Sequence, residues 1–208
     1  MPMKLPMDLL TTELKEIHSA ERQLSRALPR IARNASSERL REMLERRREQ
    51  GSRLIEAIDE ALEEIGTTRA RKKNVAMEGL IEDINQHSDE IQDERMLQAA
   101  VLASVQKIEH YCIAAWGTAK SLGKLLGQQK VVEVMERALE EGKQFDQEMT
   151  QLAEEEINVA MLSEEEAGEE EEETEEEEGA GEGQDEQRAA KSSSRKKQGG
   201  GGRRKSAP

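Results

Sequence analysis

The sequence is poor in the residues that small folds use for covalent or aromatic stabilisation. It has one cysteine, and aromatic side chains make up 1% of its 208 residues. A single cysteine excludes an intramolecular disulfide and a structural zinc site built from paired thiolates. Any core must therefore consist of leucine, isoleucine, valine, methionine and alanine side chains.

Long apolar runs are also missing. No segment approaches the ~18 consecutive apolar residues of a transmembrane helix, and residues 1–10 lack the apolar stretch of a signal peptide. The lone cysteine suits a reducing compartment. We therefore expect a cytoplasmic protein without a membrane partner.

Charge, in contrast, is abundant and unevenly distributed. Charged residues make up 37% of the chain, and the formal net charge is −14. Residues 163–187 contain fifteen acidic and no basic side chains, whereas residues 188–208 contain eight basic and no acidic ones. Neither segment can bury enough apolar surface to offset the entropy of folding, so we expect a disordered tail that is first acidic and then Gly/Ser-rich and basic.

The basic end of this tail has two interpretations. Residues 188–208 would contact phosphates electrostatically and without sequence preference, which is the usual basis of non-specific nucleic-acid binding. The alternative is a solubilising tail, and the neighbouring acidic residues would compete with phosphates. Nucleic-acid binding is therefore not the function that we expect first.

Residues 7–160 carry the apolar periodicity of amphipathic helices. Good helix formers dominate this part of the chain, and glycine and proline are sparse. Apolar residues recur at steps of three and four along four segments, which predicts four helices of about 25 residues each. The apolar positions include Leu10, Leu14, Ile17, Leu24, Leu28 and Ile31 in the first helix, Leu40, Leu44, Leu54, Ile58 and Leu62 in the second, Val101, Val105 and Ile108 in the third, and Val131, Met135, Ala138, Phe145 and Met149 in the fourth.

Several residues mark the expected helix ends. Ser36 or Ser37 is expected to cap the second helix and Asp93 the third, because their side chains accept hydrogen bonds from free backbone N–H groups. Gly66 is expected to end the second helix in the left-handed conformation. Pro29 should kink the first helix or end it within one turn.

The connections between the predicted helices define the topology. The first and second helices, and likewise the third and fourth, are joined by a few residues, so each pair must be antiparallel. The link from Gly66 to about Gln92 is long enough to return along the bundle, and it contains a short amphipathic helix around residues 77–84. The predicted fold class is all-α, a ferritin-like antiparallel four-helix bundle with one long crossover between its second and third helices.

Short motifs follow one another along these helices in an order that chance rarely produces. They are ELKE at 13–16, AERQL at 20–24, ALP at 27–29, AMEGL at 76–80, QKIEHY at 106–111, IAA at 113–115 and GT at 117–118. Together they resemble the YciE/YciF family of ferritin-like proteins over residues 7–157. The resemblance implies a rubrerythrin-like four-helix fold, a stress-associated bacterial protein, a homodimer and a two-metal carboxylate centre, without specifying a reaction.

Three glutamates are candidate ligands for such a centre, because inward carboxylates and imidazoles hold dinuclear iron or manganese in helical bundles. Glu21 occupies a slot where the periodicity asks for an apolar residue, and a buried carboxylate must be paired or bind a metal. Glu109 lies at the edge of the inner face of the third helix, and Glu141 flanks the inner slot at Gly142. The alternative is that all three glutamates lie on solvated helix edges.

Other inner positions depart from the pattern of the family. As we align it, Arg47 stands where relatives usually have histidine, and Gly51 where they often have threonine. Cys112 and Gly142 occupy glutamate-type positions. Several ligands of a two-metal centre are therefore missing, and the alternatives for the metal content are iron, manganese and no metal at all.

Arg47 leads to a sharper hypothesis. An arginine remains protonated and has no lone pair to donate, so in an inner slot it repels a divalent cation. We hypothesise that Arg47 replaces the metal electrostatically by pairing with Glu21 or Glu109, with Gly51 leaving room. The alternative is that its stem covers the core while its head remains in water.

The remaining polar residues point to no second site. Cys112 is expected to be a small buried hydrophobe, because no base or helix N-terminus is placed to lower its pKa. His18 and His87 are expected on the surface, and His110 in a hydrogen bond or dimer contact. The sequence contains no nucleotide-binding glycine loop and identifies no small-molecule substrate.

The function expected from the sequence is that of a stress-associated ferritin-like bundle whose dinuclear metal centre is reduced or lost. Such a protein would act as a structural, oligomerising protein rather than as an enzyme. The alternatives are an oxidoreductase that handles iron or peroxide with two iron or manganese ions, and non-specific nucleic-acid binding through the basic tail.

Overall fold

A computed structural model of the chain describes residues 4–67 and 72–161. These residues form five α-helices, and none of them is in a strand. The expected acidic segment 163–187 and basic segment 188–208 lie outside the described residues. The helices are α1 (Pro6–Ile31), α2 (Glu38–Glu64), α3 (Val75–Glu90), α4 (Glu94–Leu125) and α5 (Gln129–Leu152).

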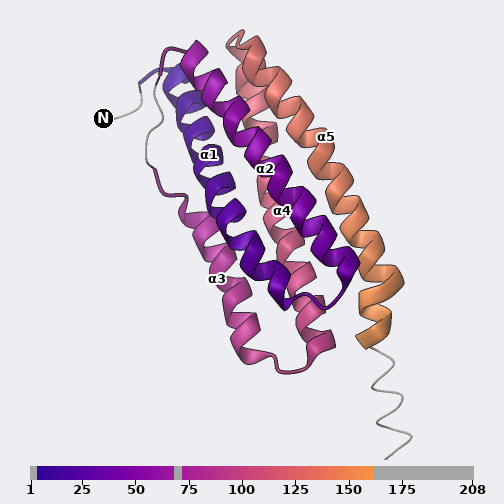
Figure 1. Cartoon of the computed structure of the whole chain (residues 1–208). Coiled ribbons are helices and arrows are strands. Elements are labelled where there is room, and N and C mark those ends of the chain that lie inside the picture. The colour runs from indigo at the N-terminus through magenta and orange to yellow at the C-terminus, as the bar shows by residue number, and fades with distance from the viewer. Residues whose placement is uncertain (1–3, 68–71, 162–208) are drawn as a thin grey trace, which may run out of the picture. The chain divides into compact units, whose positions relative to one another are not determined.

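Four of these helices form the bundle, and the fifth lies on its outside. Figure 1 shows α1 antiparallel to α2 and α4 antiparallel to α5, with α2 and α4 running in the same direction. The long link between α2 and α4 carries α3, which packs against α1 and α4. This single crossover confirms the predicted ferritin-like topology.

The helix ends follow from local chemistry. The side chain of Ser37 accepts a hydrogen bond from the backbone N–H of Leu40, and Asp93 accepts one from Met96. Gly66 follows the C-cap residue Ile65 of α2 and has a positive φ of 81°, a conformation that costs glycine little. Helix α1 continues two residues beyond Pro29 and then tightens into a 3₁₀ turn at Ala32–Asn34, as a proline near a helix end predicts.

The core is aliphatic, as the composition requires. Leu14, Leu44, Ile58 and Met135 are each fully buried, and Trp116 is the largest buried side chain. Apolar burial of this kind is the main favourable contribution to the stability of a helical bundle. None of the helices in the described part of the chain is long and apolar enough to cross a lipid bilayer.

One expectation about the surface is wrong. His18 is only 7% exposed, because the face of α1 on which it lies packs against α2. Its Nε2 atom lies 3.1 Å from Oδ1 of Asp59. His18 therefore links α1 to α2 instead of facing solvent.

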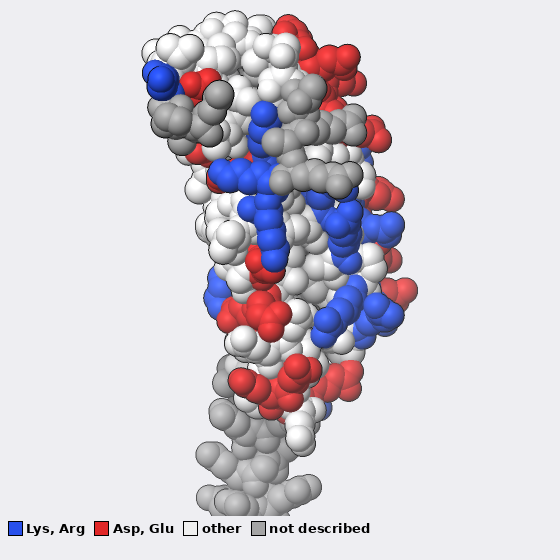
Figure 2. Space-filling model, turned by 90° about the vertical axis from the view of Figure 1, so that its left-hand side faces the viewer, with Lys and Arg blue, Asp and Glu red and all other residues white. Residues whose placement is uncertain are grey.

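The surface carries both charges in separate groups (Figure 2). Residues 22–37 contain four arginines and no acidic residue, and all four arginines are exposed. Elsewhere, ion pairs join neighbouring helices, such as Arg46 with Glu148 at 2.6 Å and Lys120 with Glu136 at 2.6 Å. Exposed pairs of this type contribute at most about 1 kcal/mol each.

Candidate functional site

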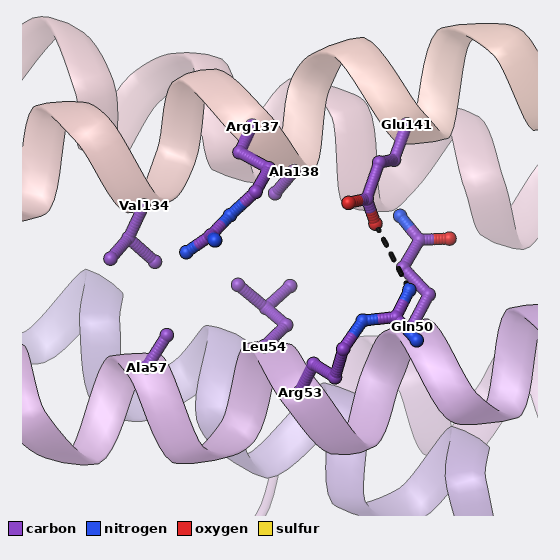
Figure 3. A pocket seen from close by; sticks show the side chains of 8 residues that line it. All are labelled: Gln50, Arg53, Leu54, Ala57, Val134, Arg137, Ala138 and Glu141. Atoms are coloured by element: carbon purple, nitrogen blue, oxygen red, sulfur yellow. Dashed lines mark ion pairs between the residues drawn. The ribbon is translucent and has the colours of Figure 1, made fainter.

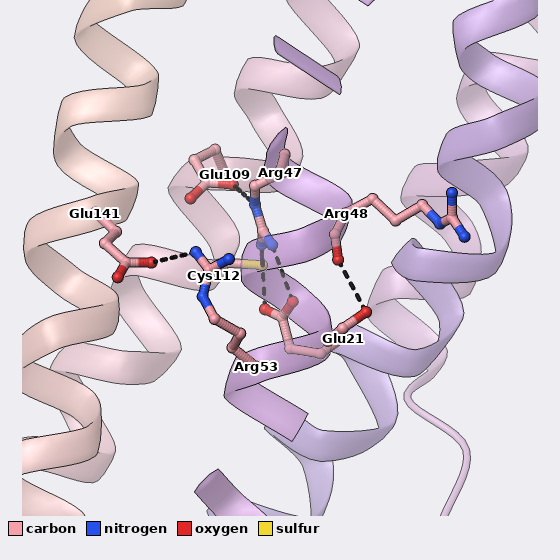
Figure 4. A network of polar contacts seen from close by, with 8 residues as sticks. Glu21, Arg47, Arg48, Arg53, Glu109, Cys112 and Glu141 are labelled. Carbon is pink, nitrogen blue, oxygen red and sulfur yellow. Dashed lines mark hydrogen bonds and ion pairs between the residues drawn. The ribbon is translucent and has the colours of Figure 1, made fainter. Parts of the chain in front are cut away.

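Three charged side chains meet in the middle of the bundle. Glu21 comes from α1, Arg47 from α2 and Glu109 from α4, and their exposed fractions are 0%, 1% and 1%. Figure 4 shows the guanidinium between the two carboxylates. We refer to these three residues as the central triad.

The triad is held by directed hydrogen bonds. Nε of Arg47 donates to Oε2 of Glu109 at 2.6 Å. Its Nη1 and Nη2 donate to the two oxygens of Glu21 at 3.0 and 3.2 Å. The planar fork of arginine matches a carboxylate in this bidentate way, and such charge-assisted bonds are roughly twice as strong as neutral ones.

Soft and aromatic groups complete the surroundings of the guanidinium. Sγ of Cys112 lies 3.7 Å from Nη2 of Arg47, and the centroid of the Trp116 ring lies 5.5 Å from Cζ of Arg47. A cation over an aromatic face is stabilised further when both groups are desolvated. Because α4 places Glu109, Cys112 and Trp116 on one face at steps of three and four, the same helix supplies an acid, a thiol and a ring.

Two glycines make room for this arrangement. A Cβ atom on Gly51 would lie 3.0 Å from Oε2 of Glu21 and 3.3 Å from Nη1 of Arg47. A Cβ atom on Gly142 would lie 2.4 Å from the ring of Trp116 and 2.7 Å from Oε1 of Glu109. Gly142 therefore admits the indole that fills the α5 side of the site.

The charges of the triad do not balance, and the pKa values reflect this. Burial alone lowers the pKa of Arg47, but the two carboxylates outweigh it and hold the pKa well above its usual value. Burial raises the pKa of Glu109, and the nearby charge of Glu21 adds to this effect while Arg47 opposes it. One guanidinium shared by two acids thus leaves Glu109 incompletely compensated, and its Oε1 has no hydrogen-bond partner among the described residues.

Cys112 is a buried thiol rather than a reactive one. It is 2% exposed and forms no disulfide. Burial raises its pKa well above the usual value, and the charge of Glu21 adds to this effect. The residue therefore remains protonated and behaves as a small hydrophobe, since the thiolate is the form that attacks or binds metal.

The residues of this site do not fit a dinuclear metal centre. In the described residues no three His, Cys, Asp or Glu side chains are grouped so that they could hold a metal ion. The space between Glu21 and Glu109 is filled by a guanidinium, which offers no lone pair. The protonated Cys112 and the bare Gly142 supply no further ligand.

Glu141 is not brought to the other candidate ligands. Its side chain is 38% exposed, and its carboxylate lies 3.6 Å from Nη2 of Arg53 (Figure 4). Adjacent residues of a helix differ in direction by about 100°, so the neighbour of an inner position points along the edge of the bundle. The inner position here is Gly142, as the periodicity predicted.

The sequence did not indicate that Trp116 belongs to the site. Its ring lies over Arg47 and against the position of Gly142. The signal was present, because Trp116 follows Glu109 by seven residues and therefore lies on the same face of α4.

Comparison with known proteins shows the family to which this chain belongs. The family described as "Domain of unknown function (DUF892)" matches residues 6–162. Protein YciF of Escherichia coli (strain K12) is 37% identical over 159 residues, which cover 76% of this chain and 96% of YciF. This chain belongs to the YciF family. The resemblance drawn from the motifs is thereby confirmed.

Solved structures of relatives share the fold. The E. coli stress protein YciF matches with a TM-score of 0.72 and 38% identity, covering 75% of this chain and 99% of YciF. YcfI from Rhodopseudomonas palustris matches with a TM-score of 0.68 and 30% identity, covering 71% and 94% of the two chains. A ferritin-like, diiron-carboxylate protein of Bacillus anthracis str. Ames has a TM-score of 0.57 and 15% identity over 72% of this chain and 99% of its own, a likeness of fold alone.

Substitution of Gly142 tests the packing of this YciF-family site. Alanine normally stabilises a helix interior by about 0.5–1 kcal/mol relative to glycine. Gly142→Ala is expected to lower the free energy of unfolding instead, because the new methyl group overlaps Trp116 and Glu109. Gly117→Ala, where a Cβ meets nothing within 4 Å, is the matched control and should stabilise the protein in urea denaturation. Equal stabilisation by both changes would contradict the close approach at Gly142.

The raised pKa of Glu109 predicts a pH dependence of stability. A carboxyl group whose pKa is higher in the folded state binds its proton more tightly there, so its contribution to stability falls as pH rises from its unfolded towards its folded pKa. The difference in unfolding free energy between wild type and Glu109→Gln should therefore fall with increasing pH across the acid range. If this difference in unfolding free energy rose with pH instead, the attraction of Arg47 for the Glu109 carboxylate would exceed the cost of burying it. Glu141→Gln, on the surface, is the control for general charge effects.

Proposed function

We propose that this chain is a stress-associated, cytoplasmic, ferritin-like protein in which an internal salt bridge takes the place of the dinuclear metal centre. It acts as a structural, oligomerising protein, as a homodimer, rather than as an enzyme. The observation that carries this proposal is the position of Arg47, whose guanidinium donates three hydrogen bonds to Glu21 and Glu109 inside the bundle.

Electrostatics supports the idea that Arg47 supplies the positive charge that a metal would bring to Glu21 and Glu109. The two acids need a positive partner because uncompensated carboxylates are costly to bury. At ~4 Å and an effective dielectric near 20, a guanidinium and a carboxylate attract by ~4 kcal/mol before desolvation is counted. The cation is thus part of the chain and does not depend on metal supply.

The names of relatives support the remaining parts of the proposal. The E. coli relative is described as a stress protein. The relative from R. palustris is described, provisionally, as a structural protein. Both match more than two thirds of this chain at 30% identity or more, so a related role is a reasonable expectation for it.

An oxidoreductase with two iron or manganese ions is the second candidate. It is favoured by the two carboxylates that α1 and α4 direct at one buried space, in a fold shared with a diiron-carboxylate protein. For such a centre to form, Arg47 would have to leave the core and Glu141 would have to turn inward. The third candidate, nucleic-acid binding, depends on residues 188–208 outside the described part of the chain.

Metal content separates the first two candidates. The full-length protein, loaded anaerobically with ferrous iron or Mn²⁺ and then desalted, is expected to retain well below one metal ion per chain by elemental analysis. Nearly two ions per chain, together with turnover of ferrous iron, would overturn the replacement of the metal and favour the oxidoreductase.

An arginine variant provides the converse test. Arg47→Met leaves Glu21 and Glu109 buried without a cation, so the free energy of unfolding in chelator should fall by about 3–5 kcal/mol. Added Mn²⁺ should restore part of this loss. Arg46→Met removes an exposed arginine from the next position of α2 and is expected to change stability by no more than about 1 kcal/mol. If Arg47→Met leaves the free energy of unfolding unchanged, and added Mn²⁺ does not alter it, the two acids do not need a cation.

A further inference from the structure

A small hollow lies between α2 and α5, outside the central triad. Its volume is about 110 Å³. Its floor is apolar and its rim is polar, and Figure 3 shows both kinds of side chain along it. The lining residues are Gln50, Arg53, Leu54, Ala57, Val134, Arg137, Ala138 and Glu141.

One buried donor in this hollow has no partner. Gln50 is 7% exposed, and its Nε2 atom makes no hydrogen bond among the described residues. A buried N–H group without an acceptor costs free energy, because it has lost its hydrogen bonds to water. A ligand that brings an acceptor to this position would remove that cost.

Two arginines in the lining of the hollow indicate that its ligand is negatively charged. Arg53 extends from α2 and Arg137 from α5, and Figure 3 shows both side chains reaching into the space between the helices. Glu141 is the one acid in the lining, and it is held only loosely by Arg53 at 3.6 Å. The pKa of Glu60 is lowered mainly by its hydrogen bond from Lys130 at 2.8 Å, and the charge of Arg137 adds a smaller effect. The hollow therefore favours an anion.

The volume of the hollow and its apolar floor limit the kind of anion that can bind. The hollow is far smaller than the pockets of roughly 300 Å³ or more that hold drug-sized molecules. Leu54, Val134 and Ala138 are buried and offer no polar group to a ligand. A short alkyl chain fits this floor, while the carboxylate at its end accepts hydrogen bonds from the rim.

We propose that the hollow between α2 and α5 binds a carboxylate on a short alkyl chain, held by Arg53, Arg137 and the free N–H of Gln50. Arginine pairs with carboxylate in fork geometry, and a guanidinium from each helix lets one anion join α2 to α5. A second hollow of about 170 Å³ shares Gln50, Arg53 and Glu141 and extends to Arg47. The anion thus binds beside the central triad, although its binding does not depend on whether the triad has replaced a metal.

Butyrate is the probe for this site, and it is titrated into the full-length protein while the side-chain signals of Gln50, Leu54 and Val134 are followed by NMR. Saturable shifts of these signals are expected. Arg53→Gln and Arg137→Gln should each weaken binding about tenfold or more, since each removes one charge-assisted hydrogen bond. Both arginines are exposed, so these variants remain folded.

Matched variants exclude a general charge effect. Arg22→Gln and Arg26→Gln remove exposed arginines from α1 and should leave butyrate binding unchanged. Ala57→Leu fills the hollow without changing charge and should abolish binding, while the melting temperature verifies its fold. Inorganic phosphate, which lacks an alkyl chain, should bind at least several-fold more weakly.

The same variants identify the source of the carboxylate. A glutamate side chain of a second copy presents the same chemistry as a free short-chain acid. If self-association measured by sedimentation is lost in Arg53→Gln and Arg137→Gln, the second copy supplies the group; if it is unchanged, the ligand is a free acid. The proposal is overturned if no signal saturates, if the two arginine variants bind butyrate as wild type does, or if phosphate binds equally well and Ala57→Leu has no effect.

Discussion

A guanidinium between two buried carboxylates is the interaction on which the centre of this bundle depends. Charges removed from water are costly, and their mutual attraction compensates this cost only when the geometry is good and the remaining hydrogen bonds are made. Arg47 meets this condition towards Glu21 through two hydrogen bonds, and only in part towards Glu109, where a third bond leaves Oε1 without a partner among the described residues. Removing Arg47 would leave two uncompensated carboxylates in an aliphatic core, whereas removing either acid would leave one ion pair.

The neighbouring residues follow from this constraint. Gly51 and Gly142 lack the side chains that would collide with the triad and with Trp116. Trp116 covers the guanidinium on one side, and Cys112 remains neutral beside it. These small and neutral groups leave the space around the guanidinium to the two carboxylates.

Most of the fold could be predicted from the sequence because helices and their ends are local features. The apolar stripes, the caps predicted at Ser36 or Ser37 and at Asp93, and the length of the link between α2 and α4 were sufficient to predict the ferritin-like bundle. The pairing of helices needs no specific side-chain contact, since two short connections and one long one allow few other arrangements.

The site was predicted less completely, because it depends on contacts between helices. Glu21 and Arg47 could be found, since each interrupts an apolar stripe at an inner slot. The edge positions Glu109 and Glu141 looked equivalent in sequence, but only Glu109 turns inward, where Arg47 offers a hydrogen bond. His18 illustrates the same limit, because its burial depends on the packing of α2 against α1 rather than on its own helix.

A double-mutant cycle between Arg47 and Glu21, measured by urea denaturation in the presence of a chelator, tests the central claim most directly. If the guanidinium is the partner of this acid, Arg47→Met destabilises the protein, and adding Glu21→Leu to it recovers part of the loss, because only Glu109 then remains without a cation. The account predicts a coupling free energy of about 2 kcal/mol or more, near the upper end for contacting residues. Additive effects of the two substitutions would show that the acid and the guanidinium do not depend on each other, and would contradict it.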